Sequence, residues 1–414
     1  MKTFKIYELG CKVNQYESQL IREQFKGAGF REGNGKPADI YVINTCTVTN
    51  SADSQSRNLL RRSLRLNPNA KIVVTGCYVE KDSDQIKKIC PDAIIVKNSE
   101  KTVIARRLTK SADEAISAEI ASISNFAAHN RAFVKIQDGC DNYCSYCKVP
   151  LVRGNSRNRD MSEIIKEIGR LARSGFKEIV LCGICLGAYK NLTGLLVEIS
   201  GIEALKRIRL SSIEPVYVNK ELIDFIASSE KMCKHFHLPL QSGDDKILKA
   251  MNRKYTKQQY TGLIEGIRGR MPLAAISTDV LVGFPGETEK KFRNTLDTLK
   301  KVMPMRIHVF GFSAREGTAA FSMPGQVGKE EREKRAKAIR SFAEECALSY
   351  AEKFLNRKLS VLTESTRDKK TGMLTGYADT YIKVLFKGED SLMNEMVDVR
   401  IKKVLSGHAL GALE

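Results

Sequence analysis

The residues that most constrain this chain are three closely spaced cysteines in "GCDNYCSYCKVP" (139–150). Cys140, Cys144 and Cys147 form a C-x3-C-x2-C pattern directly after a short β-branched run, "FVKIQ". A structural zinc site needs four ligands, and the neighbouring sequence offers no convincing fourth. Three thiolates suit a 4Fe–4S cluster whose remaining iron is open to a substrate or cofactor. We therefore expect a metal cluster at the end of a strand.

Composition places the chain among large, positively charged proteins. Its 414 residues include 68 Lys and Arg against 48 Asp and Glu, a formal net charge of +20. Such an excess favours a nucleic acid or another anionic partner, although solvation alone also explains it. The sequence predicts no membrane span, and "MKTFKIYELGC" lacks the apolar segment of a secretory signal. We expect a cytoplasmic protein without a membrane partner, whose eleven cysteines are metal ligands or core residues rather than disulfides.

Strand-like and helix-like stretches alternate over residues 1–110. The expected strands lie at 4–10, 40–45, 71–76 and 93–97. Amphipathic stretches such as 17–30 separate them, which predicts an open α/β domain with a mainly parallel sheet. Residues 111–130 are small and polar, and we interpret them as a linker.

A second alternating series occupies residues 131–355. Its six expected strands lie at 133–137, 178–183, 207–213, 234–240, 276–284 and 306–312. Six strands with helical crossovers predict a partial (β/α) barrel, in which active-site groups gather at the carboxyl ends of the strands. Residues 356–414 then change to short strands separated by turn residues, which predicts a small β-barrel.

Three further cysteines each follow an expected strand of the N-terminal domain. Cys11 follows "IYELG", Cys46 follows "YVINT" and Cys77 follows "IVVTG". Because the carboxyl ends of parallel strands share one edge of a sheet, the three thiols should meet there. They could hold a second iron–sulfur cluster. The alternative is that each is a small buried residue of the core.

Nearly the whole chain resembles the radical S-adenosylmethionine (SAM) methylthiotransferase family. The resemblance lies in the cysteine motif and in "LGCKVNQYES", "VINTCTVTN", "VTGCY", "RLSSIEP", "HLPLQSGDD", "TDVLVGFPGETE" and "HVFGFSAREGT". It implies a SAM-binding 4Fe–4S cluster on Cys140, Cys144 and Cys147 in a radical SAM barrel. It also implies an auxiliary 4Fe–4S cluster on the three N-terminal cysteines and a TRAM-like, RNA-binding module at the C-terminus.

The resemblance further implies an enzyme that adds a methylthio group to adenine in a hypermodified adenosine of the tRNA anticodon loop. "GCKVNQYES" is most similar to the branch that acts on N6-threonylcarbamoyladenosine. The alternatives are isopentenyladenosine of tRNA, an aspartate of a ribosomal protein, or a non-enzymatic zinc and RNA-binding protein. The expected partners are tRNA, an electron donor such as flavodoxin or ferredoxin, and a sulfur source.

Five residues at strand ends or, for the last of them, within a strand are expected to contact SAM. They are Gly183, Glu214, Gln241, Ser242 and Asp279. Cys182 and Cys185 stand where the family tends to have other residues, so a redox pair is the alternative to a SAM-binding turn at Gly183. The sequence identifies no catalytic residue.

Two groups of arginines are expected to contact tRNA phosphates. The first is a helical stripe, Arg57, Arg61 and Arg65, and the second follows the cysteine motif, Arg153, Arg157 and Arg159. A solvated helix face is the alternative for the stripe. Tyr377, Tyr381 and Phe386 of the C-terminal module are expected either to stack on bases or to fill a barrel core.

Overall fold

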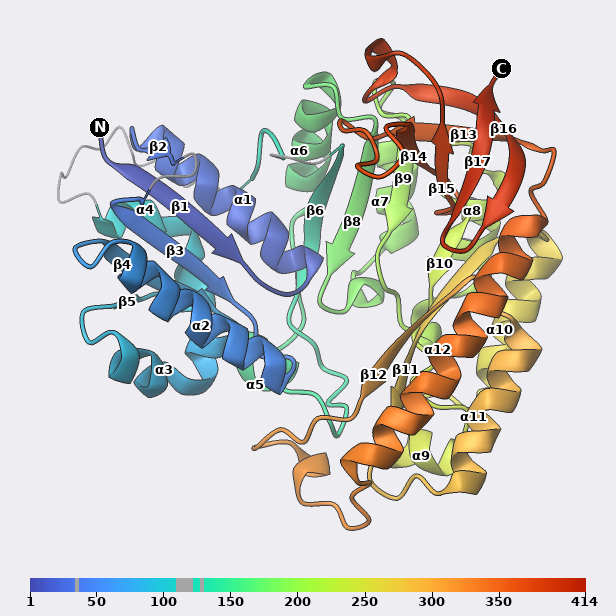
Figure 1. Cartoon of the computed structure of the whole chain (residues 1–414), viewed down its shortest axis with the longest axis horizontal. Coiled ribbons are helices and arrows are strands. Elements are labelled where there is room, and N and C mark those ends of the chain that lie inside the picture. Colours follow the sequence, from blue (N-terminus) through green and yellow to red (C-terminus); the bar gives the residue numbers. More distant parts are fainter. Residues whose placement is uncertain (34–36, 109–121, 127–129) are drawn as a thin grey trace.

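The chain folds into two α/β bodies followed by a small closed β-barrel, coloured from blue to red in Figure 1. The structure is a computed structural model that describes residues 1–33, 37–108, 122–126 and 130–414. The linker expected at 111–130 falls mostly outside the described residues. Among the described helices, none has the length and apolar character needed to cross a membrane.

The N-terminal body is a parallel sheet of five strands in the order β2-β1-β3-β4-β5. Its elements are β1 Thr3–Glu8, α1 Lys12–Gly27, β2 Arg31–Glu32, β3 Ile40–Thr45, α2 Asn50–Leu66, β4 Lys71–Gly76, α3 Cys77–Ile89, β5 Ile94–Ile95 and α4 Ile104–Leu108. Ile40 and Val42 of β3 pack on the side of α1, whereas Tyr41 and Ile43 pack on the side of α2 and α3. Because β3 is buried on both faces, it reads as a continuous apolar run.

The central body is a partial barrel made of two sheets, β7-β6-β8-β9 and β10-β11-β12. Single bridges, Ile208 to Met232 and Ser212 to His237, connect the sheets. Its strands are β6 Arg131–Asp138, β7 Arg157–Asn158, β8 Glu178–Gly183, β9 Arg207–Leu210, β10 His235–His237, β11 Ala275–Val282 and β12 Arg306–Gly311. Its helices are α5 Val149–Arg153, α6 Met161–Arg173, α7 Leu192–Ser200, α8 Lys220–Ser228, α9 Asp245–Ala250, α10 Lys257–Arg270, α11 Glu289–Val302 and α12 Lys329–Glu352. The six expected strands are present, and β7 is an additional antiparallel strand.

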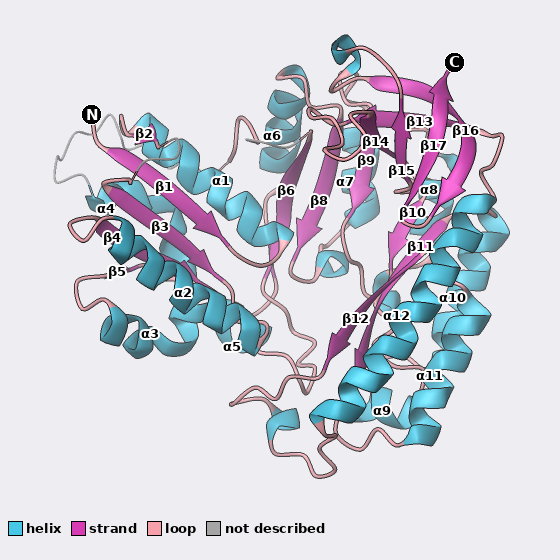
Figure 2. Cartoon of the chain, in the orientation of Figure 1, coloured by secondary structure: helices cyan, strands magenta, loops and turns pink. Residues whose placement is uncertain are grey.

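The C-terminal module is the closed barrel β13-β14-β15-β17-β16. Its strands are β13 Lys358–Thr363, β14 Leu374–Ala378, β15 Lys383–Phe386, β16 Met396–Leu405 and β17 His408–Leu413. The predicted α/β fold with a C-terminal β-barrel is therefore confirmed. Arg207 and Arg209, on β9, donate to backbone carbonyls of Tyr377 and Ala378 among others. The module thus packs at the amino ends of the barrel strands. Figure 2 shows its strands, β13 to β17, beside the ends at which β8 and β9 begin.

Candidate metal centres

The three N-terminal cysteines lie at the carboxyl edge of the parallel sheet. Cys11 follows β1, and Cys46 and Cys77 follow β3 and β4, which are successive neighbours in the sheet. Burial raises the pKa of Cys46 to about 11, and the nearby Cys77 and Cys11 thiols act in the same direction. The strand order therefore brings together three thiols that are far apart in the sequence.

Two glycines allow this close approach. Gly10 has a φ of +96°, and a Cβ atom there would lie 2.8 Å from Cys46 Sγ. Gly76 has a φ of +98°, and a Cβ atom there would lie 2.3 Å from the carbonyl oxygen of Thr45. Both positions need a residue without a side chain. Three converging thiols suit an iron–sulfur cluster with one open iron.

The cysteines of the C-x3-C-x2-C motif lie in the loop after β6, at the carboxyl edge of the barrel. The amide of Cys140 donates to the carbonyl of Gly154 over 3.0 Å. The amide group of Asn252 donates to the carbonyl of Tyr143 over 2.9 Å. These bonds hold the first half of the loop, one to the residue that follows α5 and the other to a residue shortly after α9.

The thiols in this loop differ in how readily they ionise. A hydrogen bond with Cys185 lowers the pKa of Cys140 to about 7. Burial raises the pKa of Cys147 to about 12, and the Cys144 and Cys140 thiols add to the increase. Because three neighbouring thiolates repel one another, a bound cation cluster is what stabilises them together.

Arg253 connects this loop to a residue at the end of β9. Its Nη1 donates to Cys144 Sγ over 3.3 Å, and its Nη2 pairs with the carboxylate of Glu214. The Arg253 side chain is 3% exposed. The sequence analysis did not select Arg253, because a basic residue in "MNRKYT" is indistinguishable from a surface arginine until the fold places it beside a cysteine.

Two of the residues expected to contact SAM, Glu214 and Gly183, lie at the same edge as the motif, and Asp279 lies within β11. Glu214 is the partner of Arg253. A Cβ atom on Gly183 would lie 3.0 Å from Gln137 Oε1, so this turn approaches β6 closely. Asp279 Oδ2 lies 3.1 Å from His237 Nε2. All three remain candidates for SAM or substrate contacts.

The remaining two residues of that set differ from each other. Ser242 is fully buried, and its Oγ lies 3.3 Å from Thr295 Oγ1 on α11. The expectation that Ser242 contacts SAM is therefore wrong, because its hydroxyl is used in packing α11 against the barrel. Gln241 is half-buried with a φ of +61°, and its backbone amide donates to Asp279 O over 2.8 Å. Its side chain remains a candidate.

Cys182 and Cys185 are free thiols with different neighbours. Cys182 is buried at the end of β8, where burial and the Cys11 thiol raise its pKa. Cys185 instead contacts the motif: Asn142 Nδ2 donates to its sulfur over 3.4 Å, and the thiol is hydrogen-bonded to Cys140. The two cysteines thus face the two separate cysteine sets, which disfavours a redox pair.

The structure corrects two of the expected RNA contacts. Arg153 is 4% exposed and pairs with Glu17 over 2.7 Å, and Arg159 pairs with the fully buried Glu167 over 2.7 Å. Neither guanidinium group is available to a phosphate, because each neutralises a buried carboxylate. Arg157 is exposed and remains a candidate.

The arginine stripe and the aromatic residues are placed as follows. Arg61 and Arg65 are exposed on α2, whereas Arg57 is half-buried and donates to Tyr78 Oη over 3.0 Å.

Phe386 is fully buried in the C-terminal barrel. Tyr381 stacks on His235 with ring centroids 5.1 Å apart, so it packs against the central body.

Arg315 is a second residue that the sequence analysis missed. It follows β12, and its Nη2 donates to Thr47 O over 2.9 Å and to Asp53 Oδ2 over 2.7 Å. Thr47 comes directly after Cys46, so a loop of the central barrel holds the loop of a cysteine in the other body. The two cysteine-bearing edges therefore adjoin each other.

A partial (β/α) barrel with three cysteines in the loop after its first strand defines a radical SAM enzyme. Residues 134–299 match the model of the radical SAM superfamily, and residues 3–97 match that of an uncharacterized protein family, UPF0004. Radical SAM proteins bind SAM and a 4Fe–4S cluster, and the donor set of the loop fits that cluster.

Relatives identify the family more closely. The chain is 37% identical to threonylcarbamoyladenosine tRNA methylthiotransferase MtaB of Bacillus subtilis, over 97% of this chain and 94% of that one. It is 31% identical to tRNA-2-methylthio-N(6)-dimethylallyladenosine synthase of Pelotomaculum thermopropionicum, over 100% and 98%. The chain belongs to the radical SAM methylthiotransferase family. Its fold is similar to that of the radical SAM methyltransferase TsrM from Kitasatospora setae, with a TM-score of 0.57 and 14% identity over 75% of this chain and 73% of that one.

Proposed function

We propose that this enzyme holds two iron–sulfur clusters, one on Cys140, Cys144 and Cys147 and the other on the three N-terminal cysteines. The observation that supports this proposal is that the two cysteine sets adjoin: Arg153, which ends the short helix after Cys147, donates from Nε to Cys77 Sγ over 3.3 Å. When bound, SAM and the clusters supply radical hydrogen abstraction, a sulfur atom and a methyl group. The protein positions the substrate between the two edges and excludes water from them.

We propose that the substrate is an adenosine beside the tRNA anticodon that carries the N6-threonylcarbamoyl group. Relatives from Bacillus subtilis, Chlamydia pneumoniae and Thermotoga maritima, at 34–37% identity, are threonylcarbamoyladenosine tRNA methylthiotransferases. This substituent carries a carboxylate and a hydroxyl group, whereas an isopentenyl group is a hydrocarbon. A site for it needs a cation and hydrogen-bond donors.

Lys12 has these properties and lies between the two bodies. It begins α1, and its ammonium group lies over the ring of Phe133 on β6, 6.0 Å from the ring centroid. Burial lowers the pKa of His308 on β12, and His237 and Lys12 act in the same direction, so the Lys12 charge lies near this strand of the barrel. There His237, Asp279 and His308 hold their polar atoms within 4.8 Å of one another. This polar group suits a threonyl side chain better than an isopentenyl chain.

Mass spectrometry of tRNA nucleosides from a strain without this gene tests the substrate. We expect loss of the methylthio derivative of threonylcarbamoyladenosine, accumulation of its precursor, and no change in isopentenyladenosine products. Loss of the isopentenyl product instead would move the enzyme to the other tRNA branch. Unchanged tRNA nucleosides would leave a ribosomal aspartate as the substrate, and a colourless reconstituted protein that never cleaves SAM would exclude the enzyme.

Lys12 provides a sharper test of the same site. We expect Lys12→Met to lower kcat/KM for threonylcarbamoyl-modified tRNA by at least tenfold, because the carboxylate loses its cation, and Lys12→Arg to retain most of it. Lys5→Met on β1 is the matched control. Equal activity of Lys12→Met and wild type would contradict carboxylate binding at this position.

The reaction also requires partners outside the chain. An electron donor of the flavodoxin or ferredoxin kind would reduce the clusters, and a sulfur source would replenish the transferred atom. We also propose that the protein works in the cytoplasm, where its tRNA substrate is.

A further inference from the structure

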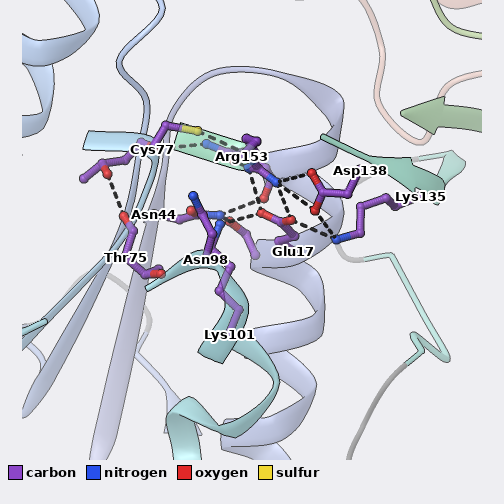
Figure 3. Close-up of polar contacts among 12 residues, drawn as sticks. Glu17, Asn44, Thr75, Cys77, Asn98, Lys101, Lys135, Asp138 and Arg153 are labelled. Carbon is purple, nitrogen blue, oxygen red and sulfur yellow. Dashed lines mark hydrogen bonds and ion pairs between the residues drawn. The ribbon is translucent and has the colours of Figure 1, made fainter. Parts of the chain in front are cut away.

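A buried network of charges joins the N-terminal body to the cysteine loop of the barrel. Figure 3 shows Glu17 of α1 at its centre, with Arg153 of α5 beside it. Arg153 Nη1 lies 2.7 Å from one Glu17 oxygen, and Nη2 lies 3.0 Å from the other. Lys135 Nζ also lies 3.0 Å from Glu17, and Arg153 Nη1 lies 3.2 Å from Asp138. Lys101 is a further partner of Glu17.

The charges of this network do not balance. Arg153, Lys101 and Lys135 are three cations, and Glu17 and Asp138 are two anions. The side chains of Arg153, Glu17 and Lys101 are at most 3% exposed, so water screens the extra positive charge poorly. An uncompensated buried charge is strongly unfavourable, so the network needs one more anion.

Cys77 is in the position to supply that anion. Arg153 Nε donates to Cys77 Sγ over 3.3 Å, as the dashed line in Figure 3 shows. The other nitrogens of the guanidinium group are directed at Glu17, Asp138 and Asn14. A cluster-bound thiolate at Cys77 therefore completes the charge balance. Arg153 itself ends α5, the short helix that follows Cys147, so one side chain reaches from one cysteine set to the other.

We propose that Arg153 is a positioning residue for the auxiliary cluster, which holds the Cys77 thiolate in place and raises the reduction potential of that cluster. This inference rests on the proposed function, in which Cys77 is a cluster ligand. Reduction adds one negative charge to the cluster, and a fixed cation hydrogen-bonded to a ligand sulfur stabilises the added charge. Glu17 opposes the effect, because its carboxylate neutralises part of the Arg153 charge.

The test uses the full chain with Cys140, Cys144 and Cys147 replaced by alanine, so that only the N-terminal cysteines can assemble a cluster. Each protein is reconstituted with iron and sulfide and titrated with dithionite, which delivers one electron to the cluster, while electron paramagnetic resonance follows the reduced form. We expect Arg153→Gln to lower the one-electron equilibrium constant about tenfold, a shift of about 59 mV to more negative potential. Arg153→Lys, which keeps the charge, should lie between Arg153→Gln and the parent.

Glu17→Gln separates an electrostatic role from a structural one. It should shift the potential in the opposite direction, to more positive values, because it removes an anion and leaves Arg153 in place. Arg335→Gln is the matched control, since it removes another buried arginine, which forms an ion pair with Glu287 over 2.8 Å. Shifts of the same sign for the Arg153 and Glu17 variants, or no shift in either, would overturn the proposal.

Iron analysis distinguishes this failure from failure of the proposed function. If the parent with its three alanines binds no iron, the N-terminal cluster does not exist and both proposals fall. If the parent binds iron but the potentials do not move, only the role of Arg153 is rejected. If Arg153→Gln retains no iron, the reduction potential of Glu17→Gln tests the role of Arg153. A shift to more positive values supports that role, and a shift to more negative values or no shift rejects it.

Discussion

Arg253 is the residue whose loss should affect the cysteine loop most directly. Replacing it with methionine leaves the Glu214 carboxylate without its partner and removes the donor to Cys144 Sγ. Because breaking a buried ion pair strands a charge, we expect the free energy of unfolding to fall by about 3 kcal/mol. SAM cleavage should fall at least tenfold. Urea unfolding and the yield of 5′-deoxyadenosine measure the two effects.

The double variant Arg253→Met with Glu214→Gln separates stability from function. It should regain much of the stability, because no charge is left unpaired, but it should not regain SAM cleavage, since Cys144 still lacks its donor. A double variant that cleaves SAM at the wild-type rate would show that Arg253 matters only for folding.

At the residue scale, the sequence carries a clearer local signal for the cysteines than for the arginines. The spacing of Cys140, Cys144 and Cys147 carries chemical information in a few residues, so it could be interpreted without a structure. Arg153 has no such local signal. Its carboxylate partner, Glu17, lies 136 residues away, so an arginine that neutralises a buried charge looked like one that contacts phosphate. Ser242 was misinterpreted for the same reason, because Thr295 was not visible as its partner.

Among secondary-structure elements, β8 and β9 depend on one buried carboxylate, and its two arginine partners also hold the C-terminal barrel. Glu178 accepts from Arg209 over 2.8 Å. Burial opposes its ionisation, but Arg209 and Arg207 hold the pKa of Glu178 below its ordinary 4.5. A carboxylate with a lowered folded pKa contributes its full stability above pH 4.5 and loses it as the pH falls through the folded pKa. Acid should therefore weaken this junction only below about pH 4.5.

The variant Glu178→Gln isolates this contribution from other titrating groups. At pH 7 it should unfold at a lower urea concentration than wild type, with a loss of about 3 kcal/mol, because two buried guanidinium groups lose their counter-ion. The difference between the two proteins should shrink as the pH falls below 4.5. A difference that stays constant from pH 7 to pH 3 would contradict the assigned role.

Element boundaries were predicted less well than element types. The strand at 40–45 was found as predicted, because a β-branched run buried on both faces leaves a clear pattern. The helix expected at 17–30 begins earlier, at Lys12, since Gly10 turns the chain immediately after β1. The small residues of β17, "HALGAL", have weak strand preference and are ordered by pairing with β15 and β16.

In the whole molecule, the relation between the two cysteine edges depends on contacts that no local pattern reveals. Arg315 reaches Thr47 across 268 residues of sequence, and Arg153 reaches Cys77 across 76. We expect Arg315→Ala to leave the two bodies folded but to loosen their contact, because the buried carboxylate of Asp53 loses one of its partners. Faster hydrogen exchange confined to the loop after Cys46 would show this effect, and unchanged exchange would contradict it.

The length of α2 determines which part of a tRNA its arginines can contact. α2 begins just after Cys46 and rises about 1.5 Å per residue, so Arg61 and Arg65 lie roughly 15–25 Å from that end, too far to touch a base placed between the cysteine sets. They should instead contact phosphates of the anticodon stem. We expect Arg61→Gln and Arg65→Gln each to reduce the slope of log K against log salt by about 1 and to leave kcat unchanged. Arg293→Gln removes an exposed arginine on α11 and is the control. If the α2 variants and this control change the salt slope equally, the stripe is only a solvated helix face.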